Sequence, residues 1–419
     1  MNLPFTNRID ELKDLNAAAA SGGLAVVFGR RRVGKTRLLT QWLKPQDGLY
    51  SQAIEAASGI QIGQVVSDMG RALDTSIVPK NWTELLELLS LQKGRVVLCL
   101  DEFPYLAASD ASLPSVIQRW LDHRRPKQFT LVLAGSSTSA MNDLFLNRAA
   151  PLYQRARKLL RVEPMSYGAF CEACGIKTSG LDSFTRYSLV GGIPKYWEFV
   201  EPRATALDLA EELFFGRSAF LEDEPARILR DEKIAGLTPL SVLEAVGRGA
   251  EKPSEIAARL GTAQTNLSRV FQQLLDASVL ARAIPFGESM RSTKKTRYRI
   301  QDPALRFWFQ VYSPHRTRWQ TYTRTEKEKL VHDHASTVFE DYCRAQHPEA
   351  ARYWEGNVEF NFARDERGSA IVSEVKFKRL SAAERRQLES HLAAAWQRSA
   401  LQSRFRKVTF EILDASVLR

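Results

Sequence analysis

The sequence predicts an α/β fold in which a parallel sheet is followed by helices and then by a second, smaller α/β unit. Three apolar runs, at residues 24–28, 95–100 and 129–134, lack polar alternation, which is typical of strands buried on both faces. They end at glycine, acidic or hydroxyl residues, as strands do at a ligand-binding edge. The 419 residues exceed what one hydrophobic core supports, so we expect several domains.

The first run leads directly into a P-loop. Residues 29–36 read Gly-Arg-Arg-Arg-Val-Gly-Lys-Thr, and residues 37–43 open a helix. This order predicts nucleotide binding, because loop N–H groups and the helix N-terminus both face the phosphates. Lys35 should reach the β- and γ-phosphates of ATP, and the Thr36 hydroxyl should coordinate Mg²⁺. The binding candidates here are Gly29, Arg32, Val33, Gly34, Lys35, Thr36 and Arg37.

Candidates for catalysis follow the later strands. Asp101 is expected to hold Mg²⁺ through water, and Glu102 to orient or deprotonate the attacking water. Ser136 stands where a polar side chain can bond the γ-phosphate or the water, although serine is also common there as a helix cap. Arg155 is either a stabiliser of transition-state charge or a surface residue.

Taken in order, these motifs resemble those of the archaeal-type P-loop ATPases of the STAND class, relatives of AAA+ and origin-recognition proteins. The resemblance implies that Asn7 and Arg8 help to hold the nucleotide base, and that Pro194, in a helical lid, approaches the nucleotide. Gln154 stands where the family usually has glycine, and the sequence leaves open whether Arg155 acts within its own chain or on a neighbour. The motifs lie at residues 5–12, 27–39, 100–105, 135–137, 151–155 and 190–196.

From residue 237 the pattern changes to short helices followed by a hairpin. Helices are predicted at residues 240–246, 252–261 and 262–277, and strands at 279–284 and 296–300. This order is that of a winged helix, whose third helix would enter a major groove and whose wing would approach phosphates. The alternative is a unit that only packs against the ATPase. The DNA-binding candidates are Gln264, Thr265, Asn266, Arg269, Lys294, Lys295 and Arg297.

The segment from residue 330 resembles the PD-(D/E)xK nuclease-like domain attached to many of these ATPases. Residues 338–344 match its first helix, and residues 358–362 and 371–376 match its core strands. A working site binds Mg²⁺ through acids and supports the attacking water with a lysine. Because a neutral amide replaces one carboxylate, we expect a degenerate module, with cleavage left open. The corresponding residues are Glu340, Glu359, Asn361, Glu374 and Lys376.

The composition is that of an ordinary globular protein with a basic surplus. No apolar run approaches the roughly 20 residues that span a bilayer, so we expect no membrane association. The net charge is +11, and residues 291–329 hold 11 Lys or Arg against 3 acids, which favours nucleic acid or a solvated surface. Few cysteines and no signal-like start predict a cytoplasmic protein. Cys171 and Cys174 form a CxxC that reads as a plain helix or a metal or redox pair.

We therefore expect an ATPase core at residues 1–165, a lid at 166–236, a winged helix at 237–316 and a nuclease-like domain at 330–419. The predicted function is Mg²⁺-dependent ATP hydrolysis by a switch that binds double-stranded DNA through the winged helix and the basic carboxyl-terminal region. The alternatives are an ATP-regulated nuclease acting on foreign DNA and a non-enzymatic scaffold that recruits proteins. A protein partner and a nucleotide-dependent homo-oligomer are further expectations.

Overall fold

A five-stranded parallel sheet forms the core of the amino-terminal part, as the sequence predicts. The computed structural model describes residues 3–70, 79–92, 94–124, 128–289 and 295–418. The strand order is β2-β3-β4-β1-β5, and all neighbours are parallel. All five carboxyl ends therefore meet at one edge. The strands are β1 (Gly23–Phe28), β2 (Leu49–Gln52), β3 (Val96–Asp101), β4 (Phe129–Gly135) and β5 (Ala156–Arg161).

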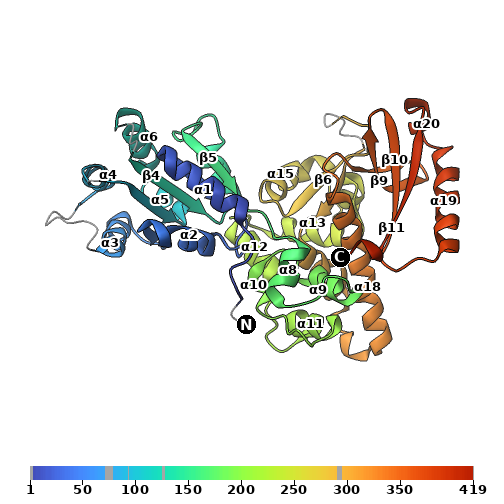
Figure 1. Cartoon of the computed structure of the whole chain (residues 1–419). Helices are drawn as coiled ribbons and strands as arrows, with labels where there is room; N and C mark the ends of the chain where they lie inside the picture. The colour runs from blue at the N-terminus through green and yellow to red at the C-terminus, as the bar shows by residue number, and fades with distance from the viewer. Residues whose placement is uncertain (1–2, 71–78, 93, 125–127, 290–294, 419) are drawn as a thin grey trace.

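Helices cover both faces of this sheet (Figure 1). The first two pack on one face through apolar residues such as Leu15 and Leu39. The next five cover the other face, where Leu85 and Phe103 are buried. They are α1 (Ile9–Ser21), α2 (Lys35–Leu43, followed by the turn η1, Lys44–Gln46), α3 (Ser58–Met69), α4 (Trp82–Ser90), α5 (Phe103–Ser109), α6 (Leu113–Arg124) and α7 (Thr138–Phe145).

The segment predicted as a lid, to which we refer as the lid, forms short helices after β5. Most of them share one core with the sheet, whereas the last packs into the core of the helices that follow it. Cys171 and Cys174 lie in the first of the lid helices as buried free thiols, and burial raises the pKa of Cys174 to about 12. A thiol that stays protonated is a poor metal ligand or nucleophile, so the CxxC is a packing element. The helices are α8 (Tyr167–Cys174), α9 (Leu181–Val190), α10 (Pro194–Trp197), α11 (Ala206–Ala210), the π-helical turn η3 (Glu211–Phe215) and α12 (Glu224–Asp231).

Three helices and a two-stranded antiparallel sheet come next, in the predicted order, around a core distinct from that of the parallel sheet. They are α13 (Leu237–Gly247), α14 (Pro253–Arg259), α15 (Ser268–Asp276), β6 (Leu280–Ala283) and β7 (Arg297–Ile300). The third helix is shorter than predicted, because Gln264–Leu267 forms the 3-10 turn η4. The Asn266 side chain donates to Thr262 Oγ1 at 3.2 Å, a local bond of the kind that competes with regular helix.

The carboxyl-terminal part is a long helix followed by a four-stranded sheet in the order β11-β10-β9-β8. The predicted helix lies inside α18 (Arg324–Ala345), and the predicted strands are β9 (Val358–Glu366) and β10 (Ser369–Lys376). The other strands are β8 (Ala351–Glu355) and β11 (Val408–Asp414), and the other helices and turns are α16 (Pro303–Phe307), η5 (Trp308–Tyr312), α17 (Ser313–His315), η6 (Trp319–Thr321), α19 (Ala382–Trp396), α20 (Leu401–Arg404) and η7 (Ala415–Val417).

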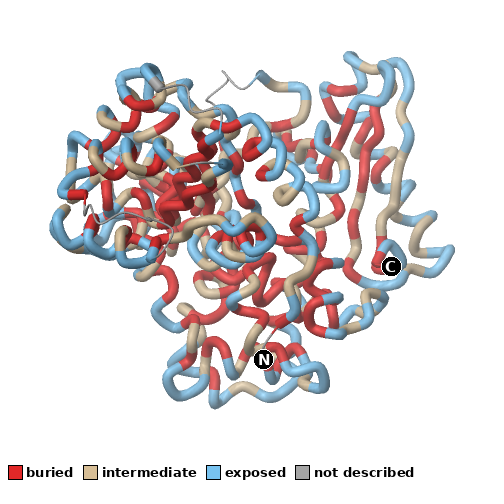
Figure 2. The backbone as a smooth tube through the Cα atoms, turned by 60° about the vertical axis from the view of Figure 1, so that its left-hand side comes forward, coloured by how far each residue is buried: buried red, intermediate tan, exposed pale blue. Residues whose placement is uncertain are grey.

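Helix α18 joins the lid to the carboxyl-terminal sheet. The buried ring of Phe339 lies 5.2 Å from that of Phe184 in the lid and 5.1 Å from that of Phe377, which follows β10. These three phenylalanines belong to one cluster of buried residues, and buried residues occupy the interior of the molecule (Figure 2). In the part of the chain that the structure describes, no helix is long and apolar enough to cross a membrane.

Candidate active site

The loop after β1 wraps around the first turn of α2. Its backbone angle φ is positive at Gly29 (148°), Arg32 (67°) and Gly34 (97°). A Cβ atom at Gly29 would lie 2.4 Å from the Val162 carbonyl oxygen. Only glycine therefore fits where the loop passes the end of β5.

Lys35 points back into this loop. Its Nζ donates to the carbonyl oxygens of Gly29 at 2.8 Å and Arg30 at 3.0 Å. Burial lowers the pKa of Lys35 to about 8, against the opposing effect of Glu102 and Asp101. The ammonium group therefore titrates near pH 8 until an anion stabilises its charge.

The predicted metal-binding pair is brought together at the carboxyl end of β3. Thr36 Oγ1 donates to Asp101 Oδ2 at 2.7 Å, and Asp101 is fully buried. Tyr50 also donates to Asp101 Oδ2, at 2.8 Å. Sequence reasoning missed Tyr50, because only the pairing of β2 with β3 brings the two residues together.

Glu102 and Ser136, predicted separately, bond to each other. The Ser136 hydroxyl donates to Glu102 Oε1, and the Ser136 amide donates to Oε2 at 3.2 Å. Glu102 has a left-handed backbone, with φ of 55°, which turns its side chain across the sheet edge toward β4. Both oxygens of the predicted base are therefore engaged by one residue.

A second carboxylate, Glu232, closes the adjacent helix end. It follows α12 and is buried, and it accepts from the N–H groups of Thr138 at 3.0 Å and Ser139 at 3.1 Å. Its Oε2 also accepts from the Ser137 hydroxyl at 3.1 Å. An acid at a helix N-terminus stabilises it. Nothing local in the sequence pointed to Glu232.

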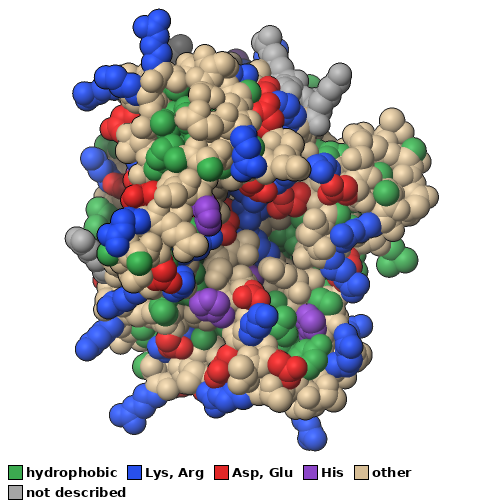
Figure 3. All heavy atoms as spheres, turned by 90° about the vertical axis from the view of Figure 1, so that its right-hand side faces the viewer, with side chains coloured by type: hydrophobic (Ala, Val, Ile, Leu, Met, Phe, Trp, Pro, Cys, Tyr) green, Lys and Arg blue, Asp and Glu red, His purple; other side chains and the backbone are tan. Residues whose placement is uncertain are grey.

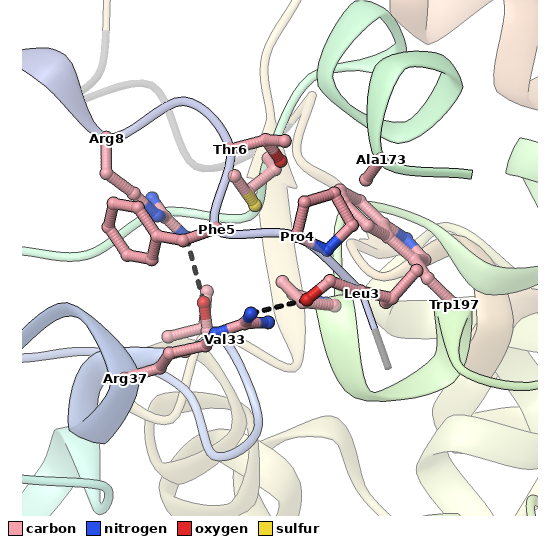
Figure 4. Close-up of a pocket in the computed structure, with 12 residues that line it drawn as sticks. Leu3, Pro4, Phe5, Thr6, Arg8, Val33, Arg37, Ala173 and Trp197 are labelled. Carbon is pink, nitrogen blue, oxygen red and sulfur yellow. Dashed lines mark hydrogen bonds between the residues drawn. The ribbon is translucent and has the colours of Figure 1, made fainter. Parts of the chain in front are cut away.

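A pocket opens between the amino-terminal segment, the P-loop and the lid (Figure 4). Its walls bring together Arg8, Val33, Gly34, Arg37 and Pro194, five of the predicted binding residues. Apolar side chains dominate the remaining wall, as suits a planar base. The other lining residues are Leu3, Pro4, Phe5, Thr6, Met165, Ala173 and Trp197.

Two arginines build this pocket by holding backbone. Arg8 donates to the carbonyl oxygens of Val33 at 2.8 Å and Glu163 at 2.9 Å, and Arg37 donates to that of Leu3 (Figure 4). Asn7 is exposed and does not line the pocket. Its left-handed φ of 58° turns the chain instead.

Glycine at residue 192 sets the position of Pro194. A Cβ atom there would lie 2.2 Å from the Met165 carbonyl oxygen. The Met165 amide also donates to the Gly192 carbonyl oxygen at 2.8 Å. This close approach carries Pro194 to the P-loop, where its ring lies 4.0 Å from a Cβ built on Gly34.

All three arginines of the P-loop are ion-paired to acids from the second half of the chain. Arg30 pairs with Asp302, Arg31 with Asp231 at 2.5 Å, and Arg32 with Glu224. The Arg32 side chain is directed to Glu224 and to the ring of Phe220, 4.8 Å from its guanidinium carbon. The Arg32 side chain therefore links the P-loop to the segment around α12.

The structure does not bring Arg155 to this site. It precedes Ala156, which pairs with Leu24 at the start of β1, whereas the P-loop follows Phe28 at the other end. Four residues of strand separate the two ends, on the order of 13 Å. Arg155 instead pairs with Asp122 at 3.2 Å.

The predicted DNA-binding residues divide into two groups. The first group, near the start of α15, is exposed: Gln264, Thr265, Asn266 and Arg269. In the second group, Lys294 lies outside the described residues and Lys295 pairs with Glu288 at 2.8 Å. Arg297 is only 17% exposed and pairs with Glu359 at 3.0 Å. The prediction that Arg297 faces phosphates is therefore wrong in this state, because the carboxyl-terminal sheet covers it.

Much of the basic surplus is likewise internal. Arg299 and Arg306 each pair with Asp341 at 2.8 Å. Burial would raise the pKa of Asp341, but Arg299, Arg306 and Arg344 outweigh it and hold the pKa well below its usual value. On the face of the carboxyl-terminal domain, basic side chains are spread among acidic ones (Figure 3).

The nuclease-like positions do not form a metal centre. Glu359 pairs with Arg297 and with Arg352, the latter at 3.1 Å, and Asn361 Oδ1 accepts from the Val375 amide at 2.8 Å. Lys376 pairs with Glu374 at 2.7 Å, and burial raises the pKa of Glu340. Within the described ranges, no group of three or more His, Cys, Asp or Glu side chains is placed to hold a metal ion.

Comparisons with known proteins agree with the nucleotide site. Residues 5–200 match a family described as "ATPase domain predominantly from Archaea". The uncharacterized protein MJECL04 of Methanocaldococcus jannaschii is 28% identical over 313 residues, which are 74% of this chain and 69% of that protein.

Two solved structures match over most of their length, and the first of them, with a TM-score above 0.5, shares the fold. The Walker-type ATPase PABY2304 of Pyrococcus abyssi is 16% identical, with a TM-score of 0.55 over 73% of this chain and 96% of that one. The ORC2 protein of Aeropyrum pernix, in ADPNP–ADP complexes, is 13% identical, with a TM-score of 0.47 over 80% of this chain and 95% of that one.

The pKa of Lys35 predicts how nucleotide binding depends on pH. Phosphates bind the protonated form, so affinity for Mg·ATP should be highest below a pKa of about 8. At pH 9 about one tenth of the lysine is protonated, and we expect about tenfold weaker binding than at pH 7. Calorimetry in buffers of different ionisation enthalpy should also detect proton uptake above pH 8. Lys35→Arg, which does not titrate in this range, should lose both effects, whereas a parent affinity independent of pH would refute the assignment.

Proposed function

We propose that the chain, whose residues 5–200 match the archaeal ATPase family described above, is a Mg²⁺-dependent switch ATPase whose second half binds double-stranded DNA. The observation that carries the proposal is the convergence of Lys35, the Thr36–Asp101 pair and the Ser136–Glu102 pair at one sheet edge. This edge holds a cation for phosphates, oxygen ligands for a metal and a carboxylate base. Hydrolysis of a phosphoanhydride needs these groups together.

Thr36 and Asp101 fit Mg²⁺, because hydroxyl and carboxylate oxygens are the ligands that this hard cation takes. When bound, Mg²⁺ would offset charge on the β- and γ-phosphates of ATP. Lys35 leaves the loop carbonyls and bonds the same phosphates. The pocket beside Phe5 and Pro194 takes the base.

In the chemical step, water attacks the γ-phosphorus in line, and the bond from that phosphorus to the β–γ bridging oxygen breaks. Glu102 orients the water and accepts its proton, and ADP leaves with the bridging oxygen. Glu102 must first exchange its bonds to Ser136 for a bond to water. Ser136 then turns toward the γ-phosphate, so the two residues switch together.

Arg155 lies at the amino-terminal end of β5, whereas the P-loop follows the carboxyl-terminal end of the neighbouring strand β1. The arginine cannot reach the γ-phosphate of its own chain without unfolding β5. Its proposed role is therefore in the site of a second copy, within a nucleotide-dependent homo-oligomer. In that assembly, the end of the sheet that carries Arg155 in one protomer faces the P-loop of the next protomer.

DNA binding is assigned to the exposed polar turn η4 and the start of α15, which follows it. Gln264, Thr265 and Asn266 lie in η4, and Arg269 lies on α15. This helix follows another short helix and leads into a hairpin, the order expected of a winged helix. The ion pairs of Arg297 move the expected contact from the hairpin to this helix. The ion pairs of Glu359 also weigh against the nuclease alternative, because a metal would have to displace two arginines.

Glu102→Gln tests the assignment of the base. The amide cannot take a proton, so kcat for ATP should fall at least about 100-fold while the dissociation constant of Mg·ATP changes little. Single-turnover hydrolysis and equilibrium binding measure the two quantities. Glu389→Gln, an exposed change on α19, is the control. A Glu102→Gln variant as fast as the parent would remove Glu102 from this role.

Arg269→Glu tests the DNA surface. Binding to a 30-base-pair duplex should weaken steeply with added salt, since phosphate contacts release counterions. The charge reversal should lower affinity at least tenfold, whereas Arg203→Glu, an exposed change in the lid, should have little effect. Fluorescence anisotropy measures both. A flat salt response, or equal binding by Arg269→Glu, would instead favour a scaffold that recruits proteins.

A further inference from the structure

Arg32 has a backbone conformation that side chains rarely adopt. Its φ is 67°, and the other two positive angles in the loop belong to Gly29 and Gly34. Glycine enters this region freely, whereas a residue with a Cβ atom is strained there. Such strain persists only where the surroundings enforce it. The P-loop therefore needs a partner that fixes Arg32.

That partner is Glu224, the first residue of α12. It is 4% exposed, and its Oε2 accepts from Arg32 Nη1. Its Oε1 accepts from the Tyr196 hydroxyl at 2.6 Å, which fixes the carboxylate. Phe220 covers the guanidinium at 4.8 Å and adds a cation–π contact. The Arg32 side chain is thus held by charge, by hydrogen bond and by an aromatic ring.

We propose that Glu224 is a positioning residue for nucleotide binding, which acts by holding Arg32 in the left-handed conformation. The inference rests on nucleotide binding at the P-loop. Arg32 is followed by Val33, whose carbonyl oxygen accepts from Arg8, and by Gly34 in the wall of the base pocket. A turn released at Arg32 would therefore disturb both the N–H groups that face the phosphates and the pocket for the base.

The neighbouring pair, Arg31 with Asp231, provides a matched control. It joins the same loop to the other end of α12 at 2.5 Å, but the Arg31 side chain is 58% exposed. Arg31 is also absent from the residues with positive φ. Exposed pairs of this kind contribute little, so loss of Asp231 should leave the loop in place.

Calorimetry with Mg·ADP tests the proposal. Glu224→Ala should weaken binding about tenfold, the equivalent of an unsupported left-handed residue. Asp231→Ala should stay within twofold of the parent. In the Arg32→Gly background, where glycine needs no support, adding Glu224→Ala should change the affinity less than twofold. Thermal unfolding of each variant shows whether it is folded.

Two results would overturn the proposal: Glu224→Ala binding like the parent, or an equal loss in both backgrounds, since Glu224 would then not act through Arg32. If Glu224→Ala does not fold, Glu224→Gln replaces it in the same comparison of the two backgrounds. Glutamine keeps an acceptor for the Tyr196 hydroxyl and loses the charge. Glu224→Gln should weaken Mg·ADP binding about threefold when Arg32 is present and not at all in the Arg32→Gly background. A folded parent that fails to bind Mg·ADP would contradict the nucleotide site itself, a result distinct from either of these.

Discussion

The ion pairs between the P-loop arginines and distant acids are the constraint on which the active site depends. A P-loop is a chain of backbone amides with few side chains to hold it, and here Arg30 and Arg32 anchor it to Asp302 and Glu224. Breaking a buried pair costs roughly 3–5 kcal/mol, because one charge is left without a partner. The P-loop and the second half of the chain are therefore held in a fixed arrangement by these pairs.

Ion pairing also accounts for much of the basic segment at residues 291–329. Composition indicates only that positive charge is concentrated after residue 291. In the folded chain, Arg299 of β7 and Arg306 of α16 both pair with Asp341 of α18. These pairs hold the hairpin and α16 against α18. Arg297 likewise pairs with Glu359, a carboxylate that would have to bind the metal in a nuclease. Much of this positive charge therefore holds parts of the chain together, and the proposed DNA surface is the polar turn before α15.

Features encoded by short-range pattern were predicted well. The three apolar runs became β1, β3 and β4, and the P-loop lies between strand and helix as its motif requires. The pairs Thr36–Asp101 and Glu102–Ser136 could be anticipated too, because carboxyl ends of parallel strands share one edge.

What failed or went unseen depends on tertiary contact. Glu224 and Glu232 are separated from their partners in the site by more than 90 residues, and no local pattern marks them. The edge of the sheet on which Arg155 lies follows from the register of β5 with β1, which sequence spacing does not give. Asn7, assigned to the base, is exposed and turns the backbone, whereas Arg8 lines the pocket and also anchors the Val33 carbonyl oxygen.

Nucleotide should bind on a P-loop in which Glu224 holds Arg32. A crystal structure with Mg²⁺ and a non-hydrolysable ATP analogue tests it most directly. We expect the base beside Phe5 and Pro194, Lys35 on the phosphates instead of the loop carbonyls, and the Arg32–Glu224 pair intact with φ of Arg32 still positive. Nucleotide bound elsewhere, or a P-loop loaded with nucleotide while Arg32 has left Glu224, would contradict the account.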